Sequence, residues 1–119
     1  MATATIPSNR YTQVALKLRF LTPFRTHGAL RSETVNGTTA DAAWMFARGY
    51  GRLPRDWART LTARRDVIDY VIYSYATPIA WHDKEAGWVV PDVRYSVTTS
   101  RHQGTVRAAL TYLDTDYAE

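Results

Sequence analysis

Residues 95–110, YSVTTSRHQGTVRAAL, begin with the pattern of a β-strand and end with the pattern of an α-helix. Tyr95 and Val97 are separated by one polar residue, as in a strand that buries a single face. Farther along, apolar residues recur at i, i+3, i+4 and i+7, the spacing that packs one helix face on a core. These residues are Val106, Ala109, Leu110 and Leu113. The stretch therefore predicts a strand that leads into a C-terminal helix at about residues 100–113.

The junction between the two halves contains a capping signal and a histidine. Ser100 is followed three residues later by Gln103, the capping-box pattern in which each side chain satisfies a free amide at a helix start. On the helical wheel, His102 lies beside Val106, on the apolar side. We expect His102 to pack half-buried and to hydrogen-bond to the sheet, with ligand binding and catalysis as the alternative roles.

The sequence before residue 95 predicts a meander of short strands. VIDYVIYSY, residues 67–75, is rich in β-branched and aromatic residues, which favour strands. Pro78 is expected to interrupt the sheet, and residues 83–87 are expected to form a polar turn. The expected strands are residues 67–75, 79–82, 88–90 and 93–97.

The first sixty residues predict strands and helices in alternation. Residues 11–20 place apolar side chains at every second position, the period of a half-buried strand. A second short strand is expected near residues 29–35, between turns. Thr39 could cap a helix at residues 40–48, and Pro54 suits the first position of another helix.

Together these elements predict an α+β fold in a single domain, residues 1–119. A small antiparallel sheet of about four to five short strands is packed by two or three helices. Within the domain we expect a flexible N-terminus at residues 1–9, a meander with its helix at residues 67–113, and an acidic tail at residues 114–119.

The composition excludes several classes of protein. With 119 residues, of which 45% are hydrophobic and 22% charged, the chain is long enough for one core and too apolar for a disordered segment. It contains no cysteine, so disulfides and thiolate metal sites are excluded. No apolar run reaches the roughly 18 residues of a membrane span, and there is no signal-peptide core. We expect a cytoplasmic protein without membrane contact, metal or cofactor.

The basic residues favour an acidic partner. The net charge is +4, and arginine, which binds phosphate bidentately, supplies 13 of the 15 basic residues. A helix start with free amides and adjacent hydroxyls is a plausible anion site. The alternatives are solvated helix faces, a GC-rich coding genome, and hydroxyls that only cap the helix. The residues expected to contact a nucleic-acid backbone are Arg94, Thr98, Thr99, Ser100, Arg101 and Arg107, with Arg55 and Arg59 as a second patch.

Two segments carry a family resemblance. YSYATPIA at residues 73–80 and YSVTTSRHQ at residues 95–103 fit the pattern YSYxTPIA…YSVTTSxHQ. This core resembles that of small proteins of unknown function encoded by actinobacterial phages and related mobile elements. The resemblance covers about the last third to half of the chain, and it implies a small phage-encoded accessory protein in the host cytoplasm. It implies no catalytic residue or substrate.

The residues predict binding and not catalysis. The three histidines have no metal-ligand spacing, and Ser100 and His102, two residues apart in a helix, do not face each other. An enzyme is therefore not expected, and one that uses His102 is only the third hypothesis. The first hypothesis is binding of the phosphate backbone of DNA or RNA. The alternative is a module that binds or modulates a host or phage protein through exposed aromatic residues, and a homo-oligomer is compatible with both.

Overall fold

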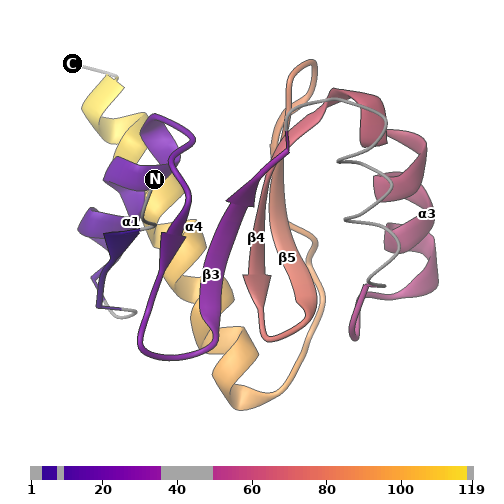
Figure 1. Ribbon diagram of the computed structural model, residues 1–119, viewed down its shortest axis with the longest axis horizontal. Coiled ribbons are helices and arrows are strands. Elements are labelled where there is room, and N and C mark those ends of the chain that lie inside the picture. The colour runs from indigo at the N-terminus through magenta and orange to yellow at the C-terminus, as the bar shows by residue number, and fades with distance from the viewer. Residues whose placement is uncertain (1–3, 8–9, 36–49, 118–119) are drawn as a thin grey trace.

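Six strands form one sheet in the order β1-β2-β3-β4-β5-β6 (Figure 1). The structure, a computed structural model, describes residues 4–7, 10–35 and 50–117. The strands are β1 (Ala4–Thr5), β2 (Phe24–Arg25), β3 (Leu30–Thr34), β4 (Ile68–Ser74), β5 (Thr77–Asp83) and β6 (Gly87–Val89). Strands β2 to β6 are antiparallel, whereas β1 joins β2 in parallel. The predicted α+β fold with an antiparallel sheet is confirmed, and β1 is an additional strand.

Helices pack on both faces of this sheet. Helices α1 (Tyr11–Arg19) and α4 (Val97–Tyr117) lie together on one face, and α3 (Arg55–Ala63) lies on the other, followed by the single turn η1 (Arg65–Val67) (Figure 1). Each face therefore has its own hydrophobic core. In β4, Tyr70 belongs to the core under α1 and α4, and Val71 belongs to the core under α3. Burial of both faces explains why this strand is apolar almost throughout.

The prediction of a strand at residues 11–20 is wrong, because this segment forms helix α1. Its buried residues are Val14, Ala15 and Leu18, which share one side of a helix, and the segment packs against α4. The alternating apolar residues Val14, Leu16, Leu18 and Phe20 do not share one face, since Val14 and Leu18 are buried whereas Leu16 and Phe20 are exposed. Alanine, leucine, lysine and arginine are also good helix formers, so local propensity agrees with the observed helix.

The prediction of a strand at residues 93–97 is also wrong. Residues 90–96 have no regular secondary structure, and α4 begins at Val97, three residues before the predicted start. The Oγ atom of Ser96 accepts the amide of Thr99 at 3.3 Å, so Ser96 caps the helix and Ser100 does not. The predicted apolar stripe is confirmed, since Val106, Ala109 and Leu113 are buried against the sheet.

Strands β3 and β4, helix α3 after Pro54 and the turn before β6 are where the sequence predicts them. Pro78 does not interrupt the sheet. It lies inside β5, opposite Tyr73 and next to a register shift between Ile72 and Tyr73, and such irregular positions are among those where a strand accepts proline. The predicted helix at residues 40–48 lies outside the described residues, as do residues 1–3 and 8–9 of the predicted flexible start. Residues 114–117 continue α4.

Candidate nucleic-acid interface

The connection from β6 to α4 is held against the helix by two side chains of α4. Nε2 of the buried Gln103 donates to the carbonyl oxygen of Pro91 at 3.3 Å, and Nη2 of Arg107 donates to the same oxygen at 3.3 Å. These contacts fix residues 91–96 along the first turns of α4. As a result Arg94, which belongs to the connection, lies beside arginines of the helix.

We call the depression that results the arginine hollow. It has a volume of about 580 Å³, and Arg94, Arg101 and Arg107 line it. The other lining residues are Asp92, Val93, Tyr95, Val97, Ser100 and Gln103. Three arginines thus line the hollow together with one acidic residue, the fully exposed Asp92. Oδ1 of Asp92 lies 3.9 Å from Nη2 of Arg107. The hollow is positively charged and open to solvent.

Two of the three guanidinium groups in the arginine hollow are available to a ligand. Within residues 50–117, no ion pair or hydrogen bond engages the side chain of Arg94 or of Arg101, and both residues are exposed. Gly104 and Arg101 both lie on the exposed side of α4, and a Cβ atom added at Gly104 would meet nothing within 4 Å. A flat or extended anion can therefore approach the helix closely at this position.

The predicted hydroxyl residues separate into different roles. Ser100 is exposed and lines the arginine hollow. Thr98 is exposed and lines a neighbouring hollow of about 440 Å³, which also contains Arg52. Thr99 also lines that hollow but is buried, and its Oγ1 accepts the hydroxyls of Ser74 and Ser96 at 3.1 and 3.2 Å. Thr99 therefore stabilises the start of α4 from inside.

His102 belongs to the same buried network. Its Nδ1 lies 2.7 Å from Oγ of Ser74, at the end of β4, and only 8% of the residue is exposed. Burial lowers the pKa of this imidazole. The predicted packing of His102 and its hydrogen bond to the sheet are confirmed.

The predicted second patch does not join the arginine hollow. Arg55 and Arg59 lie on α3 and line a separate hollow of about 340 Å³. Helices α3 and α4 cover opposite faces of the sheet (Figure 1), and the two groups of arginines line hollows that share no residue. Arg59 also has a partner, since it lies 4.0 Å from Asp56.

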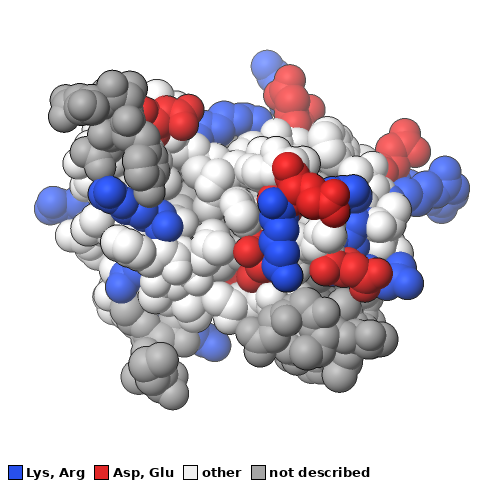
Figure 2. Space-filling view, turned by 90° about the horizontal axis from the view of Figure 1, so that it is seen from above, with Lys and Arg blue, Asp and Glu red and all other residues white. Residues whose placement is uncertain are grey.

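The opposite end of the molecule has a different charge pattern. Figure 2 shows the end that carries the turn between β5 and β6, where acidic and basic side chains lie next to one another. Arg64 donates there to the carboxylate of Asp83 at 2.9 and 3.0 Å and lies 3.7 Å from Glu85. Opposite charges cancel at this end, whereas they do not in the arginine hollow.

The comparison with protein families covers most of the fold. The DUF8033 family, described as a family of unknown function, matches residues 26–114, from the end of β2 into the last turns of α4. The chain belongs to this family. The match begins much earlier than the resemblance seen in the sequence, so α3 and β3 are also part of the shared domain. No curated protein and no solved structure matches the chain.

None of the helices in the described residues is long and apolar enough to cross a membrane. Residues 4–7, 10–35 and 50–117 contain no group of three or more histidine and acidic side chains arranged to hold a metal ion.

One polar pair is not predicted from the sequence: Nδ1 of His82 lies 2.7 Å from Oδ1 of Asp69. No motif marks this pair, because the two residues are thirteen positions apart.

Proposed function

We propose that this DUF8033 protein binds the phosphate backbone of DNA or RNA through the arginine hollow. The observation that carries the proposal is that Arg94, Arg101 and Arg107 line one open depression with a single carboxylate. Arginine binds phosphate oxygens bidentately, and the net charge of +4 adds a favourable long-range field. The resemblance to small phage and mobile-element proteins supports an accessory role in a host cytoplasm, where nucleic acid is abundant.

The salt dependence of binding tests this proposal. Fluorescence anisotropy with a labelled duplex, a single-stranded DNA and an RNA of equal length gives the affinity over a range of salt concentrations. Two phosphate contacts, by the available Arg94 and Arg101, predict a slope of about −1.8 in a plot of log K against log salt for duplex DNA, and about −1.4 for a single strand. Absence of a complex with all three nucleic acids at low salt would falsify the proposal.

Variants of the hollow give a sharper result, with changes of opposite sign. Each of Arg94→Gln and Arg101→Gln removes one cation. For a duplex, each makes the slope of log K against log salt less negative by about 0.9. Asp92→Asn removes the one carboxylate and strengthens binding, because it no longer repels phosphate. If Arg94→Gln, Arg101→Gln and Asp92→Asn all bind like the original chain, the hollow is not the interface.

A specific observation favours a protein partner as the second candidate. Leu16, in α1, and Phe20, the residue that follows this helix, are four positions apart, and they are 55% and 72% exposed. Adjacent exposed apolar side chains of this size are typical of protein interfaces. A protein complex made through them would persist at high salt and would be weakened by Leu16→Ser and Phe20→Ser but not by Arg101→Gln. The reverse result would assign the complex to the arginine hollow.

A further inference from the structure

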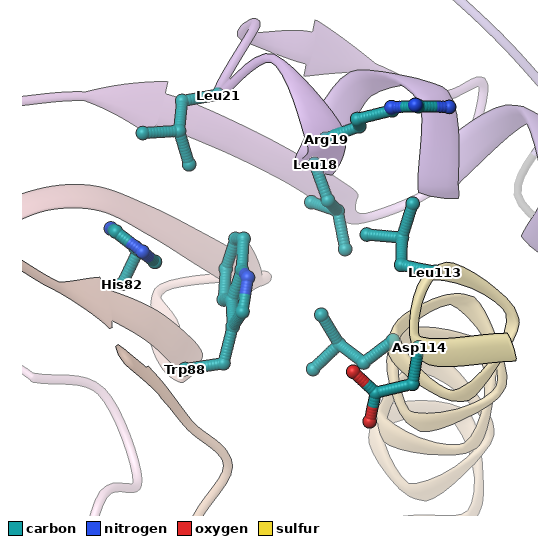
Figure 3. Close-up of a pocket in the computed structure, with 8 residues that line it drawn as sticks. Leu18, Arg19, Leu21, His82, Trp88, Leu113 and Asp114 are labelled. Atoms are coloured by element: carbon teal, nitrogen blue, oxygen red, sulfur yellow. The ribbon is translucent and has the colours of Figure 1, made fainter. Parts of the chain in front are cut away.

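A second hollow lies between the two helices of one face and the edge of the sheet, and it shares no residue with the arginine hollow. Its volume is about 530 Å³. Figure 3 shows its lining, which comes from α1, α4, β5 and β6. The residues are Leu18, Arg19, Leu21, His82, Trp88, Leu110, Leu113 and Asp114. We call it the Trp88 hollow.

Apolar side chains form most of the wall of the Trp88 hollow. Three of its leucines come from the two helices, and Leu21 lies two residues after the end of α1. The indole of Trp88 stands between His82 on one side and Leu18 and Leu113 on the other (Figure 3). Edge-to-face contacts fix this indole, with ring centroids 5.8 Å from Tyr70 and 5.0 Å from His82. A concave apolar site with an ordered aromatic wall is the usual environment for the body of a small molecule.

A β-bulge positions the polar group at one side of the hollow. The register of β4 against β5 shifts between Ile68 and Tyr70, so that Asp69 and Tyr70 together oppose His82. The bulge brings the carboxylate of Asp69 to 2.7 Å from Nδ1 of His82. A carboxylate can only accept, so Nδ1 carries the hydrogen. In the neutral imidazole Nε2 is then an acceptor, held in one orientation by Asp69 and by the contact with Trp88.

The charged groups around the hollow favour a cation. Asp114, in α4, turns its carboxylate to the side of the hollow, whereas the guanidinium of Arg19 extends away from Trp88 (Figure 3). Arg19 also has another interaction within the protein. The polar groups that remain in the lining are the indole N–H of Trp88, which is a donor, the Nε2 atom of His82, which is an acceptor, and the carboxylate of Asp114. Of the two charged residues in the lining, Asp114 is the one that turns to the hollow, so its side of the hollow favours a cation.

We propose that the Trp88 hollow binds a small amine: an apolar, preferably aromatic, body that carries a primary ammonium group. The body packs against Trp88 and the leucines, where it leaves water for an apolar surface. The ammonium interacts with the carboxylate of Asp114. His82, which Asp69 holds in one orientation, forms the wall of the hollow on the other side of the indole. This site is independent of the proposed nucleic-acid interface.

Three probes with the same aromatic body test the charge preference. They are phenethylamine, the neutral 2-phenylethanol and the acid 3-phenylpropanoate, titrated at about pH 8, above the usual titration range of histidine. Binding is followed in two-dimensional NMR spectra by the indole N–H resonance of Trp88, which Trp88→Phe assigns by its loss. We expect phenethylamine to shift this resonance in a saturable way and to bind at least about tenfold more tightly than the acid, because like charges repel in the hollow.

Variants separate the charge from the apolar wall. Asp114→Asn keeps the shape of an exposed side chain and should weaken phenethylamine several-fold while 2-phenylethanol binds as before. Asp92→Asn, at the arginine hollow, removes the same charge elsewhere and should change neither. The proposal is overturned if no probe shifts the Trp88 resonance, if the acid binds as tightly as the amine, or if Asp114→Asn leaves the preference for the amine unchanged.

Discussion

His102 couples the stability of the fold to pH. Burial lowers its pKa below the ordinary value of 6.5, so the folded protein keeps the imidazole neutral at a pH where the unfolded chain takes up a proton. The contribution is fully present above about pH 6.5 and is lost as the pH falls from there toward the lowered pKa.

We therefore predict that the urea midpoint falls between about pH 6.5 and pH 5, and that His102→Asn makes this fall smaller. Asparagine places an amide near the position of Nδ1, beside Oγ of Ser74, but it does not titrate. Urea titrations of both proteins at several pH values measure the effect. Parallel pH profiles for the two proteins would show that His102 does not titrate differently in the folded state.

Asp83 stabilises the turn between β5 and β6 through four hydrogen bonds. Its carboxylate is buried, accepts from Arg64 twice, and accepts the amides of Glu85 and Ala86 at 2.8 and 2.9 Å. The hydrogen bonds from Arg64 hold the pKa of this carboxyl well below its usual range. The associated stability is present above about pH 4 and is lost as the pH falls further, which separates it from the effect of His102.

We predict that Asp83→Ala lowers the melting temperature by about 10 °C, because it leaves the two backbone amides without their acceptor. Asp56→Ala is the matched control, since Asp56 is almost fully exposed and 4.0 Å from Arg59. Differential scanning calorimetry measures both. The control should change the melting temperature little, because surface ion pairs contribute little. Similar small shifts for both variants would contradict the assigned role of Asp83.

At the scale of the elements, the start of α4 shows why the sequence predicted one cap and the structure has another. Ser96 and Ser100 are one turn apart, and each is followed three residues later by a polar residue. The Gln103 expected to complete the capping box instead bonds to Pro91, in the preceding connection. Only that tertiary contact distinguishes the two serines, and the local sequence does not contain it.

We predict that Ser96→Ala destabilises the protein by about 1 kcal/mol and that Ser100→Ala has little effect. The Ser96 side chain accepts the amide of Thr99, whereas the Ser100 hydroxyl is exposed and lies 3.4 Å from the carbonyl of Tyr95. Urea denaturation of the two variants measures the difference. A larger loss for Ser100→Ala would restore the cap predicted from the sequence.

Two glycines with positive φ differ in what surrounds them. Gly51 (φ 54°) lies where the loop before α3 meets the turn between β4 and β5, and an added Cβ would lie 2.8 Å from the backbone of Ala76 and closer still to Thr77. Gly87 (φ 85°) starts β6 and would meet nothing within 4 Å. The first glycine therefore permits a contact between elements, and the second only permits a turn.

We predict that Gly87→Ala costs about 1 kcal/mol, the usual penalty for a side chain in this region, and that Gly51→Ala costs more than about 3 kcal/mol. The added atom at Gly51 must displace backbone as well as adopt the strained conformation. Chemical denaturation of both variants gives the two values. Equal losses would mean that the loop before α3 shifts without cost.

For the molecule as a whole, the sequence predicts the parts whose pattern is local and misses the parts that depend on register. The run of apolar residues in β4 and the apolar stripe of α4 can be read from the sequence, because each pattern lies within one continuous segment of the chain. The α1 segment shows the limit: its alternation fits a strand, but α4 offers it a helical partner. Likewise His82 and Asp69 become neighbours only through a one-residue bulge, which no spacing in the sequence indicates.

The packing of helices on both faces of the sheet also determines which arginines can contact one nucleic acid together. Since α3 and α4 lie on opposite faces of the sheet, a rigid nucleic acid that contacts the arginine hollow cannot reach Arg55 and Arg59 at the same time. We predict that Arg55→Gln with Arg59→Gln leaves the affinity and its salt dependence unchanged. Arg94→Gln with Arg101→Gln reduces the slope for duplex DNA by about 1.8.

Anisotropy titrations of the two double variants over the same salt range make the comparison, and their net charges are equal. Any difference must then come from where the charges lie and not from how many there are. Distant sites without shared contacts also act additively, so the quadruple variant should behave like the Arg94 and Arg101 double variant. An equal loss from both double variants would mean that the protein responds only to total charge, and the arginine hollow would lose its special role.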